Sequence, residues 1–390
     1  MSFNMYAPTR VLFGAGRLND LHEQVLPGKK ALLVISNGKS TRTNGALART
    51  ESQLEQAGVS VVMFDRIEAN PLKSTVMDGA ATARESGCDF IVALGGGSVM
   101  DASKAIAAMA TNGGDLWDYV GGGTGKGEPL GVAPLPVVAI TTTAGTGSEV
   151  DAWGVVSNDG TNEKIGFGGD DRLFPVLAIV DPELMLSVPP KFTAYQGFDA
   201  LFHSTEVYIS KFANLMSDMV ALTAIEAVAG NLSRAVQDGL DLEAREKVAF
   251  GNTISGYSMV AGCCTSEHSL EHAMSAYHHD LPHGAGLIMI SKAYYEHFIE
   301  KHVCDDRFIR MAQALGMKDA KRAEDFITML DKLQKDCGVD DLKMSDYGIR
   351  AEEFETLAKN AMETMGGLFA SDPAPLSVDD CVRIFEKSYR

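Results

Sequence analysis

Short apolar runs alternate with longer amphipathic stretches through the first half of this chain, and this alternation limits its possible folds most strongly. Glycine and polar residues bound the runs, and segments with helical periodicity separate them. Buried strands spaced by helices are typical of a parallel sheet with crossover helices. We therefore predict a Rossmann-like α/β domain with strands at residues 31–35, 60–64, 89–94, 137–140 and 177–180, and helices near 44–56, 73–86 and 101–111.

The pattern changes after the segment Asp181-Pro182-Glu183-Leu184, where strand signals fade and helical periodicity takes over. Apolar residues at positions 215, 219, 222, 225, 228 and 232 fall three or four apart, which predicts a helix that buries this stripe. We therefore predict a domain boundary between residues 185 and 186. The second part, 186–390, is expected to be all-helical.

Composition narrows the range of partners. The 390 residues include 34 Lys and Arg against 52 Asp and Glu, a net charge of −18. Such a surface repels phosphate backbones and anionic lipid, so we expect neither a nucleic-acid nor a membrane partner. The N-terminus lacks the apolar segment of a secretory signal, and the six cysteines form no CxxC motif. These features predict reduced thiols in a cytoplasmic protein.

Two polar loops follow predicted strands. Gly95-Gly96-Gly97-Ser98 comes directly after one strand and precedes a helix, so its backbone N–H groups could hold a diphosphate. The spacing is not GxGxxG, and a simple tight turn is the alternative. Residues 141–149, rich in Thr and Ser, follow the next strand at the edge where α/β sheets bind ligands. A loop that only caps a helix is the alternative there.

Histidines cluster in the second half. Five of the nine fall between residues 268 and 283, while Asp199 and His203 share one helix face through their i, i+4 spacing. One carboxylate with several imidazoles is a ligand set that suits Fe(II) or Zn(II). Any one histidine could instead be an ordinary core or surface residue. His278 and His279 lie in a polar run, and we assign them no ligand role.

Taken together and in order, these motifs resemble those of the iron-containing (group III) alcohol dehydrogenase family. The matching segments are residues 95–104, 141–149, 181–184, 197–203 with Glu206, and 268–284. The resemblance spans nearly the whole chain. It implies a dinucleotide-binding α/β domain at 1–185, a helical metal-binding and catalytic domain at 186–390, and a homodimer or higher homo-oligomer.

The resemblance also implies roles for individual residues. The metal ligands would be Asp199, His203, His268 and His283. The histidine one turn after the third ligand, His272, would lie by the nicotinamide and relay the proton. The cofactor contacts would be Ser40, Asn70, Pro71, Gly96, Gly97, Ser98, Asp101, Thr141, Thr142 and Thr146.

Two features depart from the family pattern. The interval from His272 to His283 is one residue longer than in typical members. In addition, the segment after the second strand, residues 36–40, lacks the acid that would bind the ribose hydroxyls of NAD and repel a 2′-phosphate. Either NAD or NADP therefore remains open as the cofactor, with a slight preference for NADP.

The sequence thus predicts a metal-dependent oxidoreductase that transfers a hydride between NAD(P)(H) and a small primary alcohol or aldehyde, acting as an aldehyde reductase. Fe(II) is the expected metal, with zinc as the alternative. Three other readings stay open: a zinc-dependent polyol (glycerol-type) dehydrogenase, a metal-dependent lyase or hydrolase of the same superfamily, and a metal- or nucleotide-binding protein without catalysis.

Overall fold

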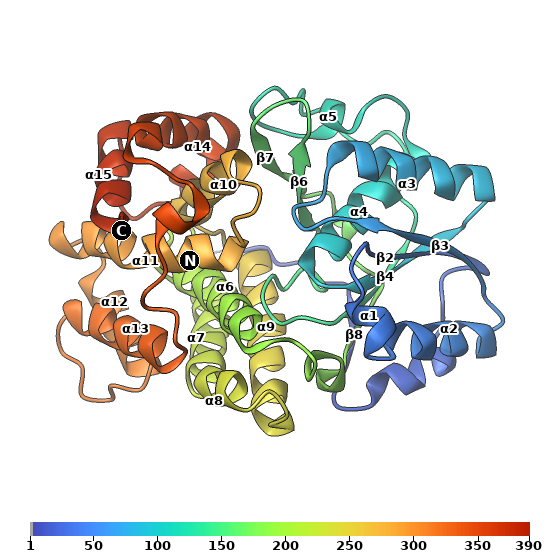
Figure 1. Cartoon of the computed structure of the whole chain (residues 1–390), viewed down its shortest axis with the longest axis horizontal. Helices are drawn as coiled ribbons and strands as arrows, with labels where there is room; N and C mark the ends of the chain where they lie inside the picture. The colour runs from blue at the N-terminus through green and yellow to red at the C-terminus, as the bar shows by residue number, and fades with distance from the viewer. Residues whose placement is uncertain (1–2) are drawn as a thin grey trace. The chain divides into compact units, whose positions relative to one another are not determined.

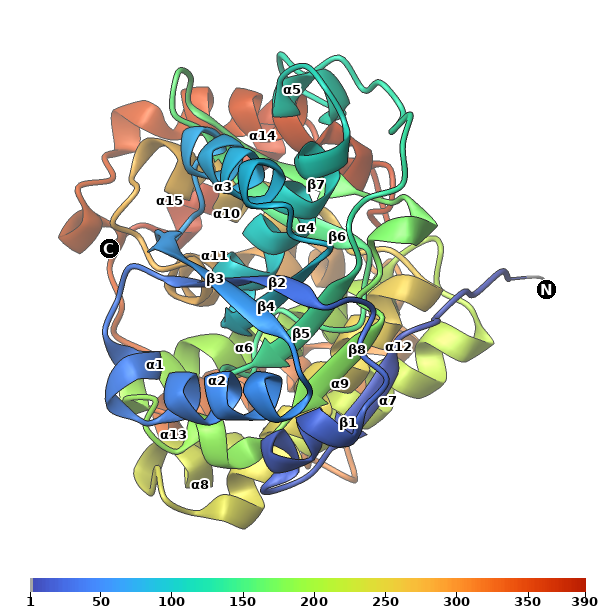
Figure 2. The ribbon, with the colours of Figure 1, turned by 90° about the vertical axis from the view of Figure 1, so that its right-hand side faces the viewer.

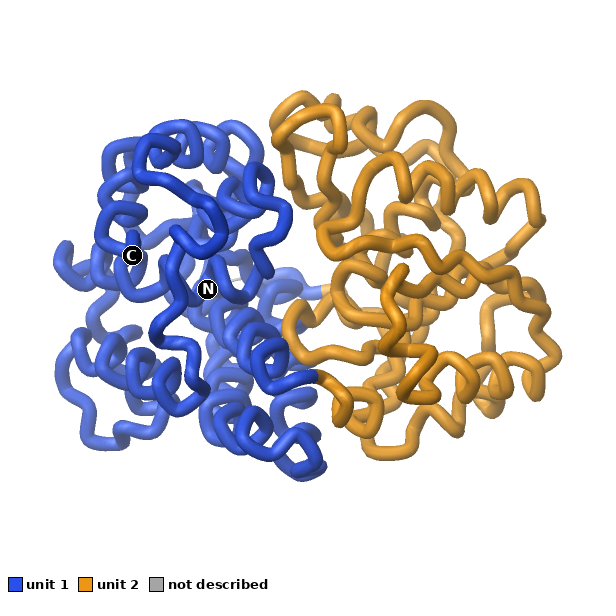
Figure 3. The backbone as a smooth tube through the Cα atoms, in the orientation of Figure 1, with its two compact units in different colours: residues 1–5, 189–390 blue, residues 6–188 orange. Residues whose placement is uncertain are grey.

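The computed structural model describes residues 3–390, which form two compact units (Figure 3). One unit runs from Tyr6 to Val188, and the other comprises residues 3–5 together with Pro189–Arg390. The first is an α/β unit and the second is helical (Figure 1).

Six parallel strands form the sheet of the α/β unit, in the order β1-β8-β5-β4-β2-β3. Their bounds are β1 Arg10–Phe13, β2 Lys30–Ser36, β3 Ser60–Ile67, β4 Phe90–Gly95, β5 Val137–Thr141 and β8 Leu177–Val180. The five predicted strands are confirmed. The sequence pattern did not show β1, because it is a four-residue edge strand that pairs only with β8.

Helices cover both faces of this sheet (Figure 2). Leu18, Leu47 and Leu54, from the 3₁₀ helix at 17–23 and from α2, are buried in one core with the side chains of β2, β4, β5 and β8. Figure 2 shows α3 and α4 on the opposite face. The helices are α1 Ser40–Thr43, α2 Ala46–Gln56, α3 Lys73–Ser86, α4 Gly97–Thr111 and α5 Leu116–Tyr119.

The three predicted helices of this unit are confirmed, with one shift that matters for the site. Helix α4 begins at Gly97, four residues before the predicted start at 101, so Gly97 and Ser98 of the glycine turn (residues 95–98) lie in its first turn. An antiparallel hairpin, β6 Trp153–Asn158 and β7 Glu163–Gly168, lies outside the main sheet. The sequence pattern did not indicate this hairpin, which is absent from the predicted strands.

The second unit is all-helical over its described residues, as predicted. Its helices are α6 Pro190–Ile209, α7 Leu215–Ala229, α8 Leu232–Gln237, α9 Leu242–Ala261, α10 Ser266–Tyr277, α11 His283–Glu300, α12 Asp305–Ala314, α13 Glu324–Asp336, α14 Phe354–Phe369 and α15 Val378–Ser388. Short 3₁₀ helices at 344–347 and 351–353 precede α14.

The predicted buried stripe on α7 is wrong at its N-terminal end. Leu215 is 67% exposed and Met219 58% exposed, whereas the small residues Ser217 and Ala221 are fully buried. Because α7 is apolar on nearly every side, periodicity could not identify its buried face. Small side chains on the buried face let helices approach closely: a Cβ at Gly251 of α9 would lie 2.6 Å from Val228 of α7.

By length and composition, the stretch Leu215–Gln237 passes as a membrane span, with a mean hydropathy of 1.3 and 33% of its window buried. It is interrupted, because α7 ends at Ala229 and α8 begins at Leu232. Helix α7 alone rises only ~22 Å, less than the ~30 Å of a hydrocarbon core. The expectation of no membrane partner stays a prediction.

Candidate metal and dinucleotide sites

Three helices of the second unit supply the residues predicted to bind metal. Asp199 and His203 lie one turn apart on α6, His268 is in the first turn of α10, and His283 is the first residue of α11. A close helix contact makes this arrangement possible. A Cβ on Gly284, next to His283, would lie 2.2 Å from the backbone oxygen of Tyr195 on α6, so only glycine fits there.

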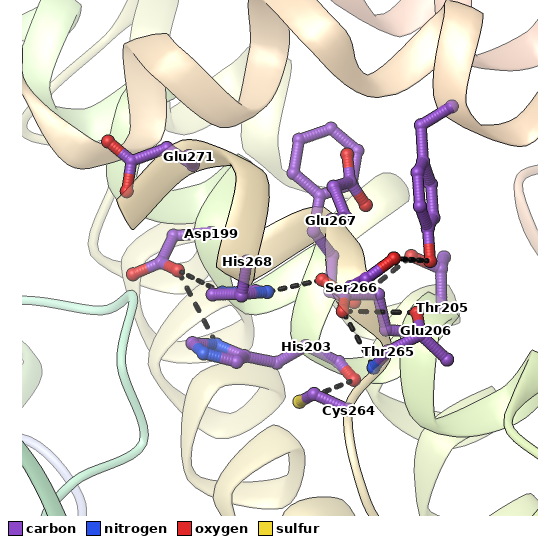
Figure 4. A network of polar contacts seen from close by, with 12 residues as sticks. Asp199, His203, Thr205, Glu206, Cys264, Thr265, Ser266, Glu267, His268 and Glu271 are labelled. Carbon is purple, nitrogen blue, oxygen red and sulfur yellow. Dashed lines mark hydrogen bonds and ion pairs between the residues drawn. The ribbon is translucent and has the colours of Figure 1, made fainter. Parts of the chain in front are cut away.

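The three histidines converge on one carboxylate oxygen of Asp199 (Figure 4 shows Asp199, His203 and His268). Asp199 Oδ1 lies 3.5 Å from His203 Nδ1, 3.4 Å from His268 Nε2 and 3.5 Å from His283 Nε2. The rings of His203 and His268 stack with 4.3 Å between centroids. Donor atoms of Asp199, His268 and His283 all lie within 4.8 Å of one another. The structure therefore brings the four predicted ligands together.

These separations suit a bound cation. Two ligand atoms that each lie ~2.1 Å from a tetrahedral metal ion are ~3.4 Å apart, close to the observed 3.4–3.5 Å. The charges suit it as well. Although burial opposes ionisation, His203 and His283 hold the pKa of Asp199 well below its usual range. Burial is likewise outweighed at His268, where Glu206 and Asp199 raise the pKa well above its usual range. Glu206 and Asp199 thus surround His268 with negative charge, which a bound cation would offset.

Further buried carboxylates surround the cluster. Glu206 on α6 contacts His268 Nδ1, and Glu271 on α10 contacts His283 Nδ1. Glu267 accepts a 2.6 Å hydrogen bond from the hydroxyl of Tyr295. In the sequence, Glu206 stands out only as part of a motif, and neither Glu267 nor Glu271 was predicted to belong to the site. The available signal was their position immediately before a histidine on the same short helix.

His272, the predicted proton relay, lies one turn after His268 on α10 and is 3% exposed. Its ring centroid is 5.2 Å from that of His283. Its Nδ1 contacts the sulfur of Met365 at 2.7 Å. Met365 has φ −131° and ψ 38°, which interrupts α14 beside this contact. The structure thus places His272 next to the cluster, and Met365 is a neighbour that the sequence did not indicate.

Asp372 binds the start of the histidine helix. Its carboxylate accepts hydrogen bonds from the Ser266 N–H at 2.9 Å, the Ser266 hydroxyl at 2.8 Å and the Tyr294 hydroxyl at 2.9 Å. Burial outweighs these hydrogen bonds and raises the pKa of Asp372 to about 7. The folded protein therefore holds a proton that the unfolded chain releases at lower pH. This difference lowers the free energy of unfolding as pH rises from about 4 to 7.

An Asp372→Asn variant removes this titration. Its amide oxygen can still accept from the Ser266 N–H and the Tyr294 hydroxyl, and its NH2 group can donate to the Ser266 hydroxyl. We expect the difference in unfolding free energy between pH 5 and pH 8 to shrink by a few kcal/mol relative to the unchanged protein. Urea denaturation at both pH values measures it. An identical pH dependence in both proteins would contradict the prediction.

In the α/β unit, the predicted cofactor residues follow the carboxyl ends of parallel strands. Gly96 precedes α4 in an extended conformation, and no side chain caps this helix end among the described residues. A Cβ on Gly96 would lie 2.9 Å from Thr143, and one on Gly97 would lie 2.3 Å from Thr146. Glycine therefore lets the Thr-rich loop pack directly on the start of the helix. Backbone N–H groups in that position suit a diphosphate.

Asp101, also predicted to contact the diphosphate, is buried in a network inside the unit. Its carboxylate accepts hydrogen bonds from the Ser148 hydroxyl at 2.7 Å and the Val155 N–H at 3.0 Å. Lys104, which is 1% exposed, donates to Ser148 at 2.8 Å and to Asp151 at 2.7 Å. Burial, only partly offset by Lys104, raises the pKa of Asp101 to about 6. These contacts give Asp101 an internal structural role, and its contact with the diphosphate stays a prediction.

The remaining predicted cofactor residues lie around the same sheet edge. Thr141 ends β5 and its hydroxyl donates to the Thr143 carbonyl, while the Thr142 N–H donates to the Gly95 carbonyl. Asn70 has a positive φ of 56° after β3, and Ser40 is exposed at the start of α1, after β2. The other residues of this set are Pro71, Ser98 and Thr146, of which Pro71 accepts from the Ser157 N–H and Thr146 from the Ser148 N–H.

Comparison with known proteins agrees with both units. Residues 8–182 match the family described as iron-containing alcohol dehydrogenase, and residues 193–389 match the C-terminal part of the Fe-containing alcohol dehydrogenase family. The chain is 34% identical over 400 residues to 1,3-propanediol dehydrogenase of Klebsiella pneumoniae, with 100% of each chain covered. It is 30% identical to the NAD-dependent methanol dehydrogenase of Bacillus methanolicus, with 99% of each covered.

Solved structures give the same result. An archaeal halo-thermophilic alcohol dehydrogenase from a Red Sea brine pool superposes with a TM-score of 0.94 at 35% identity, covering 100% of this chain and 99% of that one. A 1,3-propanediol oxidoreductase superposes with a TM-score of 0.90 at 34% identity, with both chains fully covered. The fold, the sequence and the arrangement of motifs therefore agree, and the chain belongs to the iron-containing alcohol dehydrogenase family, whose members are oxidoreductases that act on alcohols.

Proposed function

We propose that this enzyme reduces small aldehydes to primary alcohols, and catalyses the reverse reaction, with a nicotinamide cofactor and a divalent iron ion. The observation that carries the proposal is the convergence of three imidazole nitrogens at 3.4–3.5 Å from one oxygen of Asp199. The names of two relatives, a 1,3-propanediol dehydrogenase and a methanol dehydrogenase, support a small primary alcohol as the substrate class.

Asp199, His203, His268 and His283 are proposed to hold the metal. A divalent ion supplies Lewis acidity toward an alcohol or carbonyl oxygen, which lowers the barrier to hydride transfer. One carboxylate and three imidazoles suit both Fe(II) and Zn(II), and iron is proposed because the chain belongs to an iron-containing family. The four residues are proposed to fix the position of the reacting oxygen, and the burial of Asp199, His203 and His268 limits the access of competing water to it.

The glycine turn and the start of α4 are proposed to bind the diphosphate of the cofactor, through Gly96, Gly97 and Ser98. The segment after β2 offers the exposed Lys39 and Ser40 and no carboxylate between residues 36 and 40. Such a segment accepts a 2′-phosphate without repulsion. We therefore propose that the enzyme uses NADPH as well as NADH, although one relative is named as NAD-dependent.

His272 is proposed to pass the proton between the substrate oxygen and solvent. A His272→Ala variant should retain its metal and lose activity by roughly 10²–10⁴-fold, since a positioned general acid or base contributes about that much. The pH profile of kcat should lose the ionisation that belongs to His272. Metal analysis together with the pH profile tests this. Loss of the metal from the variant, or an unchanged rate, would contradict the assigned role.

The activity is tested most simply by absorbance at 340 nm. We expect protein purified without oxygen and supplied with Fe(II) to oxidise NADH or NADPH in the presence of short-chain aldehydes, and to lose this activity on chelation. Parallel reactions with Zn(II) distinguish an iron from a zinc enzyme. Hydrolysis of substrates without any change at 340 nm would instead indicate a metal-dependent hydrolase. A homo-oligomer in the cytoplasm, with aldehyde reduction as the main direction, completes the proposal.

A further inference from the structure

We propose that Glu206 and Glu271 are positioning residues that fix the protonated nitrogen of two histidines of the cluster, so that the opposite nitrogen of each ring presents its lone pair to the metal. This inference rests on the proposed function of Asp199, His268 and His283 as metal ligands. It assigns to Glu206 and Glu271 a role in metal affinity that the motifs alone do not give them.

Glu206 is held rigidly behind His268. Its side chain is fully buried, and one carboxylate oxygen contacts His268 Nδ1. The other oxygen accepts hydrogen bonds from the Thr265 N–H at 2.8 Å and the Thr265 hydroxyl at 3.1 Å. Thr265 immediately precedes α10, the helix that carries His268. Glu206 thus ties α6 to the start of α10 and sets the orientation of the His268 ring (Figure 4).

Glu271 plays the same part for His283. It is fully buried on α10, and one of its oxygens contacts His283 Nδ1. Space for it comes from Gly286 on α11, because a Cβ at that position would lie 2.7 Å from Glu271 Cγ. The absence of a side chain at Gly286 therefore lets Glu271 reach the ring from the side opposite Asp199.

The consequence follows from the chemistry of imidazole. A neutral ring carries one N–H and one lone pair, and the partner of one nitrogen decides which is which. A carboxylate at Nδ1 accepts the N–H and leaves the lone pair on Nε2. In both His268 and His283 it is Nε2 that lies 3.4–3.5 Å from Asp199 Oδ1. Such carboxylate partners typically contribute 10- to 100-fold to metal affinity.

Separate metal sites formed by Glu206, Cys264 and His268, or by Glu271, His272 and His283, are the competing interpretations, since the donor atoms of each set also lie within 4.8 Å of one another. The contacts of Glu206 favour the positioning role. Both of its oxygens are already engaged, one by His268 and the other by the two hydrogen bonds from Thr265. A second cation would have to break these contacts.

The test compares metal affinities of purified, metal-free proteins. Dissociation constants for Co(II) and Zn(II) are measured by competition with a chelator, for the unchanged protein and for Glu206→Leu and Glu271→Leu. Glu267→Leu is the matched control, because Glu267 is equally buried on α10 but bonds Tyr295 instead of a histidine. We expect each of the first two variants to bind 10- to 100-fold more weakly, and the control to bind like the unchanged protein.

Glutamine variants separate hydrogen bonding from packing. In Glu271→Gln the amide oxygen can still accept the Nδ1–H of His283, so this protein should lose less affinity than Glu271→Leu. In Glu206→Gln the single amide oxygen has to serve either His268 or Thr265, so the recovery of affinity over Glu206→Leu should be smaller. In the zinc-loaded protein, NMR of ¹⁵N-labelled histidine should show a protonated Nδ1 on His268 and His283. The signal of His268 should change in Glu206→Leu, and that of His283 in Glu271→Leu.

Three results would overturn the inference: unchanged affinity in both leucine variants, an equal loss in Glu267→Leu, or binding of a second metal ion that disappears with Glu206→Leu. One further result would contradict the proposed function itself. If the unchanged protein bound neither Co(II) nor Zn(II), the ligand assignment would be wrong, and the inference would fall with it.

Discussion

Replacing His268 with alanine is expected to abolish most metal binding and to lower kcat by about 10³-fold or more. The Lewis acidity of a bound ion contributes several kcal/mol to the transition state, and each 1.36 kcal/mol corresponds to a factor of ten. His268 lies 3.4 Å from Asp199 Oδ1, the oxygen that all three histidines contact, and its ring stacks on that of His203. Its removal therefore takes a donor atom from the middle of the cluster. Metal content, measured by elemental analysis after anaerobic loading, and kcat should fall together.

Dinucleotide affinity should survive this change, because the glycine turn belongs to the other compact unit. Titration of NADH fluorescence measures it in the same preparations. His302→Ala is the matched control, since the His302 side chain is 74% exposed and pairs only with the nearby Asp305 among the ion pairs of the described residues. Full activity in His268→Ala would contradict the ligand assignment. Equal losses of metal and of kcat in His268→Ala and His302→Ala would contradict it as well.

A Lys104→Met variant is expected to lose about 3–5 kcal/mol of stability, since it leaves the buried carboxylate of Asp151 without its cation. For a unit of this size, that loss corresponds to roughly 6–20 °C in Tm. Lys104 also links α4 to the loop that carries Ser148. Its loss should therefore loosen the glycine turn and weaken NADH binding while metal binding in the helical unit persists.

Lys126→Met provides the control for this variant. Lys126 forms an ion pair with Asp118 at 2.6 Å, but its side chain is 64% exposed, so the pair contributes little to stability. Differential scanning calorimetry of both variants should show a large shift in Tm for Lys104→Met and almost none for Lys126→Met. Similar shifts in Tm for the two variants would contradict the prediction that the buried ion pair of Lys104 contributes more to stability than the exposed pair of Lys126.

Much of the fold could be predicted because its signals are local. The central strands are continuous apolar runs, and the crossover helices begin and end near clear turn residues. The spacing of apolar residues and the positions of turn residues were therefore enough to predict these elements. Strand β1 was not predicted because it is short and lies at an edge of the sheet, where few apolar residues are required. The buried face of α7 was assigned wrongly because Leu215 and Met219 are as apolar as its true core residues, and only the packing of neighbouring helices distinguishes them.

The candidate metal site was predictable for a related reason. Asp199 and His203 share a helix face, and His268 and His283 bracket a dense run of histidines, so the residue types and their spacing indicated a cation. Glu271 could not be recognised in the same way, because its role depends on where α11 starts relative to α10. The partners of Asp101 likewise come from a loop and a hairpin that the sequence pattern did not place beside α4.

The most direct test of the account is X-ray anomalous scattering at the iron edge, from crystals of protein loaded with Fe(II) without oxygen. The account predicts one strong anomalous peak in each chain, within about 2.0–2.3 Å of donor atoms of Asp199, His203, His268 and His283. A peak at any other position, or none from fully loaded and active protein, would contradict it.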